Sequence, residues 1–125
     1  ALPICFARGS KGEIGLMQVM REWAVSDWAK ANGVAVPPEA ALYSPRLNIE
    51  VGTWYLAKGL RKWRNYKEYE ALALAEYNAG GVVKKWKPPE YDGDVLSRIT
   101  YASTRDYVSS IMRKYEEYSI HREAE

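Results

Sequence analysis

The chain has 125 residues, enough for one domain with a hydrophobic core of its own. Its formal net charge at pH 7 is only +2, and acidic and basic residues are interspersed, so no basic stripe for a nucleic acid stands out. One cysteine excludes an intramolecular disulfide, and no apolar run approaches the roughly 18 residues of a membrane span.

Aromatic residues are the unusual part of the composition, with five Trp and ten Tyr. Such a surplus has two interpretations. The rings can fill a helical core, or they can line a groove where ring faces meet sugars or bases. The opening Ala1–Phe6 is too short and lacks the basic start of a signal peptide, so any export sequence is expected outside these residues.

Apolar positions recur at helical rather than strand spacing, which predicts an all-α fold. Before the first helix, residues 1–14 contain Pro3, Gly9 and Gly12 and are predicted to be irregular. Loops are expected at 34–45 and 88–94, and a frayed tail at 119–125. The predicted helices are 16–31, 46–64, 67–79 and 104–118, with a short helical turn over 82–86.

The first predicted helix follows a glycine-rich stretch directly. Leu16, Val19 and Trp23 have a spacing of three to four residues, and Gly33 after Asn32 provides a left-handed cap at the end. On this interpretation, the polar side chain at position 18 lies near the first turn and can face a cleft.

The two middle helices differ in character. In the helix over 46–64, an apolar stripe runs along one face through Leu47, Val51, Trp54 and Tyr55. The helix over 67–79 is almost wholly apolar at residues 72–75, as expected for a buried central helix.

Four short motifs resemble those of the lytic transglycosylase family, the goose-type-lysozyme-like enzymes with an SLT domain that cut peptidoglycan glycan strands. They follow one another in the family's order. The motifs are Gly12-x-x-Gly15-Leu16-Met17-Gln18, Pro45-x-x-Asn48-Ile49-x-x-Gly52-x-x-Tyr55-Leu56, Ala75-Glu76-Tyr77-Asn78-Ala79-Gly80 and Tyr101-x-x-Thr104-Arg105-x-Tyr107-Val108.

The resemblance implies a lysozyme-like helical fold, with residues 1–125 as one SLT domain that lacks the first helix of its core. It also implies the reaction. One Glu acts as acid and then as base, the sugar's N-acetyl oxygen replaces the second carboxylate of most glycosidases, and the sugar's 6-hydroxyl leaves a 1,6-anhydro end. No cofactor or metal is implied, and the implied location is the cell envelope, either periplasmic or extracellular.

The resemblance implies that Gln18, Met20, Tyr77, Asn78 and Tyr101 bind the substrate. Each has a structural alternative. Met20 can equally be a core residue, Tyr77 can be a buried structural tyrosine, Asn78 fits the turn after its helix, and Gln18 can be an exposed residue of its helix. Ser10 lies one residue from a position where the family often has a cleft serine.

Two departures concern the catalytic chemistry, and they leave the catalytic residue unknown. The family's catalytic Glu would fall one position before Ala1, and Ser103 stands where the family has Glu before Thr-Arg. Glu13 and Glu76 are the remaining acids near the motifs, and both are expected to be solvated charges. We therefore expect impaired catalysis.

The alternative to an enzyme is a glycan-binding or scaffold module without catalysis, and a helical module for another partner is a third option. A missing core helix would also leave an apolar patch exposed, which predicts self-association. His121 stands alone near the end of the chain, so no metal site is expected.

Overall fold

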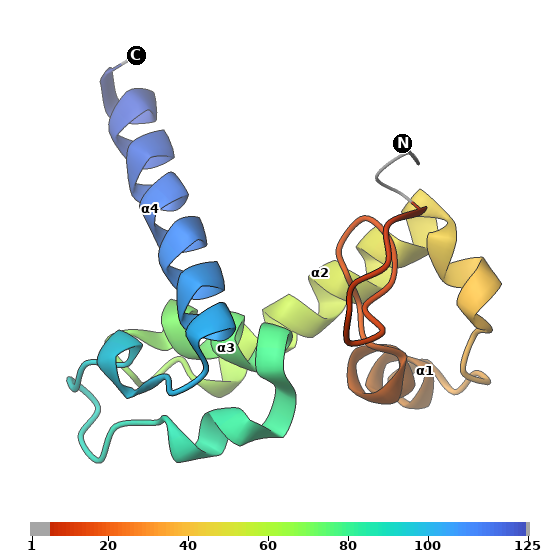
Figure 1. Ribbon diagram of the computed structural model, residues 1–125, viewed down its shortest axis with the longest axis horizontal. Helices are drawn as coiled ribbons and strands as arrows, with labels where there is room; N and C mark the ends of the chain where they lie inside the picture. The colour runs from red at the N-terminus through yellow and green to blue at the C-terminus, as the bar shows by residue number, and fades with distance from the viewer. Residues whose placement is uncertain (1–5, 125) are drawn as a thin grey trace. The chain divides into compact units, whose positions relative to one another are not determined.

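The computed structural model describes residues 6–124, and its regular structure is helical (Figure 1). Within that range, β pairing is confined to isolated bridges that join residue 14 to residues 8 and 19, so the predicted all-α class is confirmed. The long helices are α1 (Ser26–Asn32), α2 (Pro45–Lys62), α3 (Tyr69–Ala79) and α4 (Ala102–Ala124). Shorter helical turns are η2 (Arg21–Val25), η3 (Glu39–Tyr43), η4 (Gly80–Lys85) and η5 (Leu96–Arg98).

Two compact units divide the chain, Ala1–Lys58 and Gly59–Glu125, and the division falls inside α2. Each unit has its own buried side chains and is described by itself. Among the described residues, no helix combines the length and the apolarity that a bilayer span needs.

The core of the first unit is small and aliphatic. Ile14, Val19, Val25, Leu42 and Val51 are buried there. The stripe predicted along α2 contributes to it, because residue 51 is fully buried and the residues at 47 and 55 pack against the cluster.

For the first helix, the predicted start is wrong and the predicted end is confirmed. Regular helix begins at Arg21, five residues later than predicted, because the backbone at Gly15 and Gln18 has positive φ values of 76° and 50° that no α-helix can contain. At the other end, Gly33 takes the left-handed conformation at φ 64°, ψ 32°, and its N–H donates to the carbonyls of Ala29 and Lys30.

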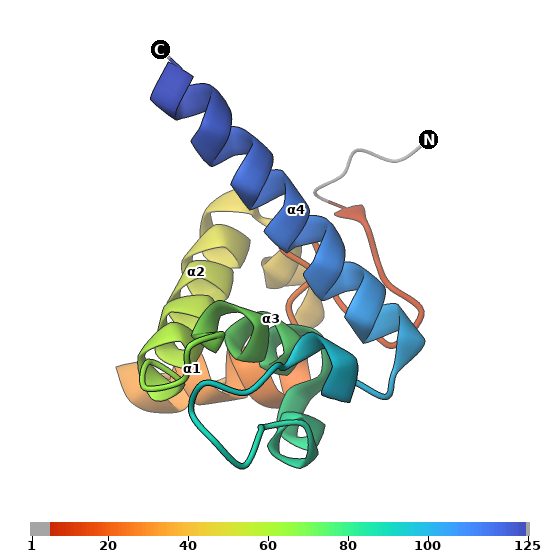
Figure 2. The same cartoon turned by 90° about the vertical axis from the view of Figure 1, so that its left-hand side faces the viewer.

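The second unit is built around α3. Its residues Ala71–Ala75 are all buried, as the apolar run predicted. The N-terminal half of α4 passes beside α3 (Figure 2), and Val108 of α4 is fully buried there. The short turn predicted at 82–86 is η4, and the Trp86 that follows it is buried and donates its indole N–H to the Thr100 hydroxyl at 3.0 Å.

The last helix is longer than predicted at both ends. α4 continues to Ala124, so the frayed tail predicted from Ser119 is wrong over the described residues, and Glu125 lies outside them. No Gly or Pro occurs after residue 93 to stop the helix. The C-terminal half of α4 is largely exposed, with Tyr118 72% and Ile120 69% accessible.

Candidate active site

The Gly15–Gln18 motif forms a tight turn rather than the start of a helix. Ile14 and Val19 exchange two backbone hydrogen bonds of 3.0 Å, and the N–H of Gln18 donates to the Gly15 carbonyl at 3.0 Å. The turn is further tied by the N–H of Gly15, which donates to the carbonyl of Ala7 at 2.8 Å. The prediction that Gln18 lies on the first turn of a helix is therefore wrong, and its side chain is positioned by a strained turn instead.

The Gln18 side chain is held against its own turn. Its amide Nε2 donates to the Gly15 carbonyl at 2.7 Å and to the Ala7 carbonyl at 3.3 Å. Because both hydrogens of Nε2 are used in this way, a ligand would meet the amide oxygen Oε1. The half-buried Gln18 can therefore act toward a substrate as an acceptor rather than as a donor.

The side chain of Asn48, on α2, makes hydrogen bonds to the same turn. Asn48 was not among the predicted site residues. The side chain is completely buried. Its Oδ1 accepts the N–H of Met17 at 2.7 Å, and its Nδ2 donates to the carbonyls of Ile14 at 2.9 Å and Leu42 at 2.8 Å. The available signal was an Asn inside an amphipathic helix, within a motif that accompanies the glycine-rich one. One amide thus fixes the turn that carries Gln18.

Met20 has only 8% of its surface exposed, and it lines a hollow of about 400 Å³ in the first unit. Arg8, Lys11 and Arg21 also line the hollow, and the Arg8 guanidinium pairs with the Glu39 carboxylate at 2.5 Å. The hollow therefore has an apolar wall and a charged rim. Ser10 is exposed and does not line it.

The second unit holds the other three predicted site residues. Tyr77 is buried on α3 with 9% of its surface exposed, and Asn78 follows it half-buried. The Asn78 amide oxygen accepts the hydroxyl of the buried Thr104 of α4 at 2.7 Å, so Asn78 joins the end of α3 to the start of α4. Tyr101 precedes α4, is 45% exposed, and stands edge-on to the buried Trp86 ring with centroids 5.0 Å apart.

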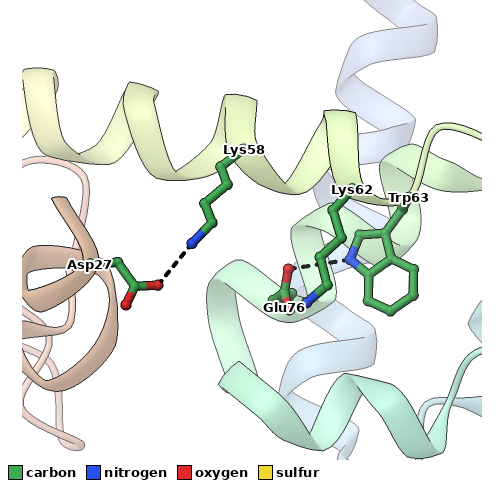
Figure 3. A network of polar contacts seen from close by, with 5 residues as sticks. All are labelled: Asp27, Lys58, Lys62, Trp63 and Glu76. Atoms are coloured by element: carbon green, nitrogen blue, oxygen red, sulfur yellow. Dashed lines mark hydrogen bonds and ion pairs between the residues drawn. The ribbon is translucent and has the colours of Figure 1, made fainter. Parts of the chain in front are cut away.

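Glu76 is not the solvated charge that was predicted. Its carboxylate pairs with the Lys62 ammonium at 2.6 Å and accepts the indole N–H of Trp63 at 3.2 Å, and its side chain is only 12% exposed (Figure 3). The Lys62 ammonium also lies over the Trp63 ring, 4.9 Å from its centroid. Glu76 therefore links the end of α2 to α3.

Glu13 is also engaged, within the glycine-rich loop. Its carboxylate accepts the backbone N–H of Lys11 at 2.8 Å, and the side chain is half-buried. At the start of α4, Ser103 stands exposed where the motif comparison expected a glutamate. Among the described residues, no three His, Cys, Asp or Glu side chains gather as metal ligands would, and His121 lies exposed near the end of α4.

A family model and a solved structure both relate this chain to lytic transglycosylases. Residues 6–95 match a family model described as Transglycosylase SLT domain. The structure of an inactive mutant of the lytic transglycosylase Slt from Pseudomonas aeruginosa is similar to this chain, with a TM-score of 0.65 and 29% sequence identity over 84% of the chain. The chain corresponds to only 17% of the length of that protein. No curated protein matches it.

Proposed function

Because the chain belongs to the Transglycosylase SLT domain family, as its motifs predicted, we propose that it forms the glycan-binding body of a peptidoglycan lytic transglycosylase. The fold is the lysozyme-like helical fold that the resemblance implied. The proposed substrate is the bond between N-acetylmuramic acid and N-acetylglucosamine, and the proposed product carries a 1,6-anhydro end. The proposal places the protein in the bacterial cell envelope, where peptidoglycan is found.

The single observation that carries this proposal is the match over residues 6–95. It contains both the turn that presents Gln18 and the end of α3 that presents Tyr77 and Asn78. On the proposal, the Gln18 amide oxygen accepts a hydrogen bond from a substrate amide or hydroxyl. Met20 is the apolar wall of a sugar subsite, and the Tyr77 hydroxyl lies near the substrate's N-acetyl group.

The remaining two residues are assigned supporting parts. Asn78 keeps two amide hydrogens for a sugar oxygen while its own oxygen accepts the Thr104 hydroxyl. The exposed ring of Tyr101, which is held edge-on by Trp86, borders the bound strand.

The reaction requires one acid that donates its proton to the glycosidic oxygen. The N-acetyl oxygen then stabilises the sugar carbon, and the 6-hydroxyl closes on that carbon as the same group, now a base, takes its proton. We propose that neither Glu13 nor Glu76 is this acid. Glu13 accepts a backbone N–H, and Glu76 is ion-paired with Lys62 and accepts the Trp63 indole N–H, so both carboxylates are already engaged in contacts within the fold.

We therefore expect the 125-residue chain to be severely impaired on its own. The test compares this chain with a version that carries a helix ending in Glu ahead of Ala1, by mass spectrometry of digested cell-wall sacculi. The extended form should release fragments with 1,6-anhydro ends, and the 125-residue chain should release them at least about a hundredfold more slowly, the value of a positioned acid.

Glu13→Gln and Glu76→Gln in the extended form provide the controls, and each should leave the rate within about twofold. A loss of a hundredfold or more in either variant, with the fold intact, would identify that residue as the acid and refute this part of the proposal. If both forms bind sacculi and neither yields anhydro ends, the second candidate, a glycan-binding module without catalysis, is the correct one.

A further inference from the structure

A cluster of tyrosines surrounds the start of α3, at the opposite end of this helix from Tyr77. Tyr66, Tyr69 and Tyr91 line an open hollow of about 450 Å³ in the second unit. Tyr69 is the first residue of α3 and Tyr77 lies eight residues later, which is about 12 Å along the helix axis. Within the second unit, the hollow is thus separate from Tyr77 and Asn78, which are proposed above to bind substrate.

Two of the tyrosine rings contact each other. Tyr66 stands edge-on to Tyr91 with ring centroids 4.9 Å apart, and it also stands edge-on to the ring of the buried Trp63, with centroids 5.8 Å apart. Tyr91 nevertheless keeps 62% of its surface exposed. Because Tyr91 is exposed next to a second ring rather than singly, the two form a small exposed apolar patch, and such patches mark binding sites.

The loop that carries Tyr91 is fixed in place. The N–H of Lys67 donates to the Tyr91 carbonyl at 2.7 Å, and the N–H of Val95 donates to the Glu68 carboxylate at 2.9 Å. Between these anchors the N–H of Gly93 closes a turn on the Glu90 carbonyl at 3.1 Å. A ligand that meets the Tyr91 ring therefore has little loop entropy to overcome on binding.

The polar lining of the hollow indicates the class of ligand. Arg64, Asn65 and Asp92 supply planar guanidinium, amide and carboxylate groups around the rings. A pyranose ring presents C–H groups on its faces and hydroxyl or amide groups at its edge, so it can stack on a tyrosine while its edge meets planar polar groups. The lining also includes Lys67, so two cationic side chains and one carboxylate offer both donors and an acceptor to the hydroxyl and amide groups of a sugar.

We propose that this tyrosine hollow is a second saccharide-binding site, which holds an N-acetylated hexose of a glycan strand away from the end of α3 that carries Tyr77 and Asn78. Naming the glycan of peptidoglycan as the source of that hexose rests on the proposed function. The consequence is a chain that contacts its polymer at two places, so that the bound strand is retained when one contact opens.

The experiment titrates the 125-residue chain with a hexamer of N-acetylglucosamine and follows backbone amide signals by NMR. Amides at 64–67 and 90–93 report on the tyrosine hollow, while those at 15–20 and 77–80 report on the residues proposed for the reacting sugars. The inference requires that the first set shifts. If only the second set shifts, this inference fails and the proposed function stands, and if neither set shifts both fail.

Variants then identify the ring as the cause. Tyr91→Ala should weaken the affinity read from the first set about tenfold, the loss expected for one aromatic contact, while Tyr91→Phe should stay within about twofold. Tyr118→Ala, which removes a ring that is 72% exposed on α4, is the matched control and should bind as the parent does. Equal losses for Tyr91→Ala and Tyr118→Ala, or a loss for Tyr91→Phe as large as that for Tyr91→Ala, would overturn the inference.

Discussion

At the scale of single residues, Asn48 shows how one buried side chain can organise a motif distant in sequence. Its amide accepts one N–H from the glycine-rich turn and donates to the carbonyls of Ile14 and Leu42. Buried backbone groups in irregular segments must find partners somewhere. In this chain α2 supplies those partners through a single side chain.

Replacing Asn48 by Ala should lower the free energy of unfolding by about 2–4 kcal/mol, because three hydrogen bonds are lost and only the Ile14 carbonyl keeps a second bond, from the Val19 N–H. Urea denaturation followed by circular dichroism measures the loss. Asn32→Ala is the control, since Asn32 makes only an exposed hydrogen bond to the Trp28 carbonyl, and we expect it to cost under about 1 kcal/mol. Equal costs for the two variants would contradict the role assigned to Asn48.

Two glycines of the first unit share a positive φ but differ in the space around them. Gly12 and Gly15 both have positive φ, at 90° and 76°. A methyl group on Gly12 would meet no atom within 4 Å, whereas on Gly15 it would lie 2.9 Å from the Leu42 carbonyl oxygen and closer still to the Asn48 amide. Position 12 therefore requires glycine only because of its backbone conformation. Position 15 requires it also because a side chain would clash with its neighbours.

We expect Gly12→Ala to cost about 1–2 kcal/mol, the ordinary penalty of a left-handed residue. Gly15→Ala should cost about 3–4 kcal/mol, because overpacking against a fixed carbonyl adds to that penalty. Thermal and urea unfolding of both variants under the same conditions test the difference. If Gly15→Ala is no worse than Gly12→Ala, the turn can move away from Asn48 and the tight packing described here is not required.

At the scale of elements, the sequence predicted where helices exist better than where they begin and end. The buried run at 71–75 is so apolar that only a central helix suits it, and the cap at Gly33 follows from the left-handed preference of glycine. The start of the first helix was misplaced because the spacing of Leu16, Val19 and Met20 also fits a helix. The competing turn depends on Asn48, 33 residues after Gly15, and no local pattern encodes that contact.

The candidate site was predictable only in part, for a similar reason. The motifs identified Gln18, Tyr77 and Asn78 as residues of interest. They did not reveal that the Gln18 donors are used by its own turn, nor that the Asn78 oxygen accepts the Thr104 hydroxyl. Which atoms of a polar side chain remain available to a ligand is decided by tertiary contacts, and a sequence motif does not contain this information.

The junction of α2 and α3 offers an element-scale prediction. A methyl group on Gly59 of α2 would lie 3.3 Å from the Ala73 side chain and 3.7 Å from the Glu76 carboxylate of α3. Gly59→Val should therefore push α2 and α3 apart and lower the free energy of unfolding by about 1–3 kcal/mol. Gly81→Val, at an exposed position with nothing within 4 Å, is the matched control and should change it little. An unchanged free energy of unfolding for Gly59→Val would show that α2 and α3 can accommodate a larger side chain at this contact.

At the scale of the whole molecule, the two compact units share α2. Units of about 60 residues bury a smaller fraction of their surface than larger domains do and are marginally stable alone. The division at Lys58 and Gly59 falls inside one continuous helix, and helix formation is cooperative along its length. The matched family segment, 6–95, also runs through this division. These facts favour the prediction that residues 1–125 act as one domain, and self-association of that domain stays a separate prediction.

One domain should unfold in one step, and NMR spectra recorded at increasing urea test this directly. The amide signals of Val25 in the first unit and Val108 in the second should disappear with the same midpoint. Val51→Ala removes buried methyl groups from the first unit only, and it should lower both midpoints equally, by the equivalent of about 2 kcal/mol. If the midpoint of Val25 falls in this variant while that of Val108 stays unchanged, the units unfold independently. In that case α2 is a linker between two domains, rather than the shared helix of one.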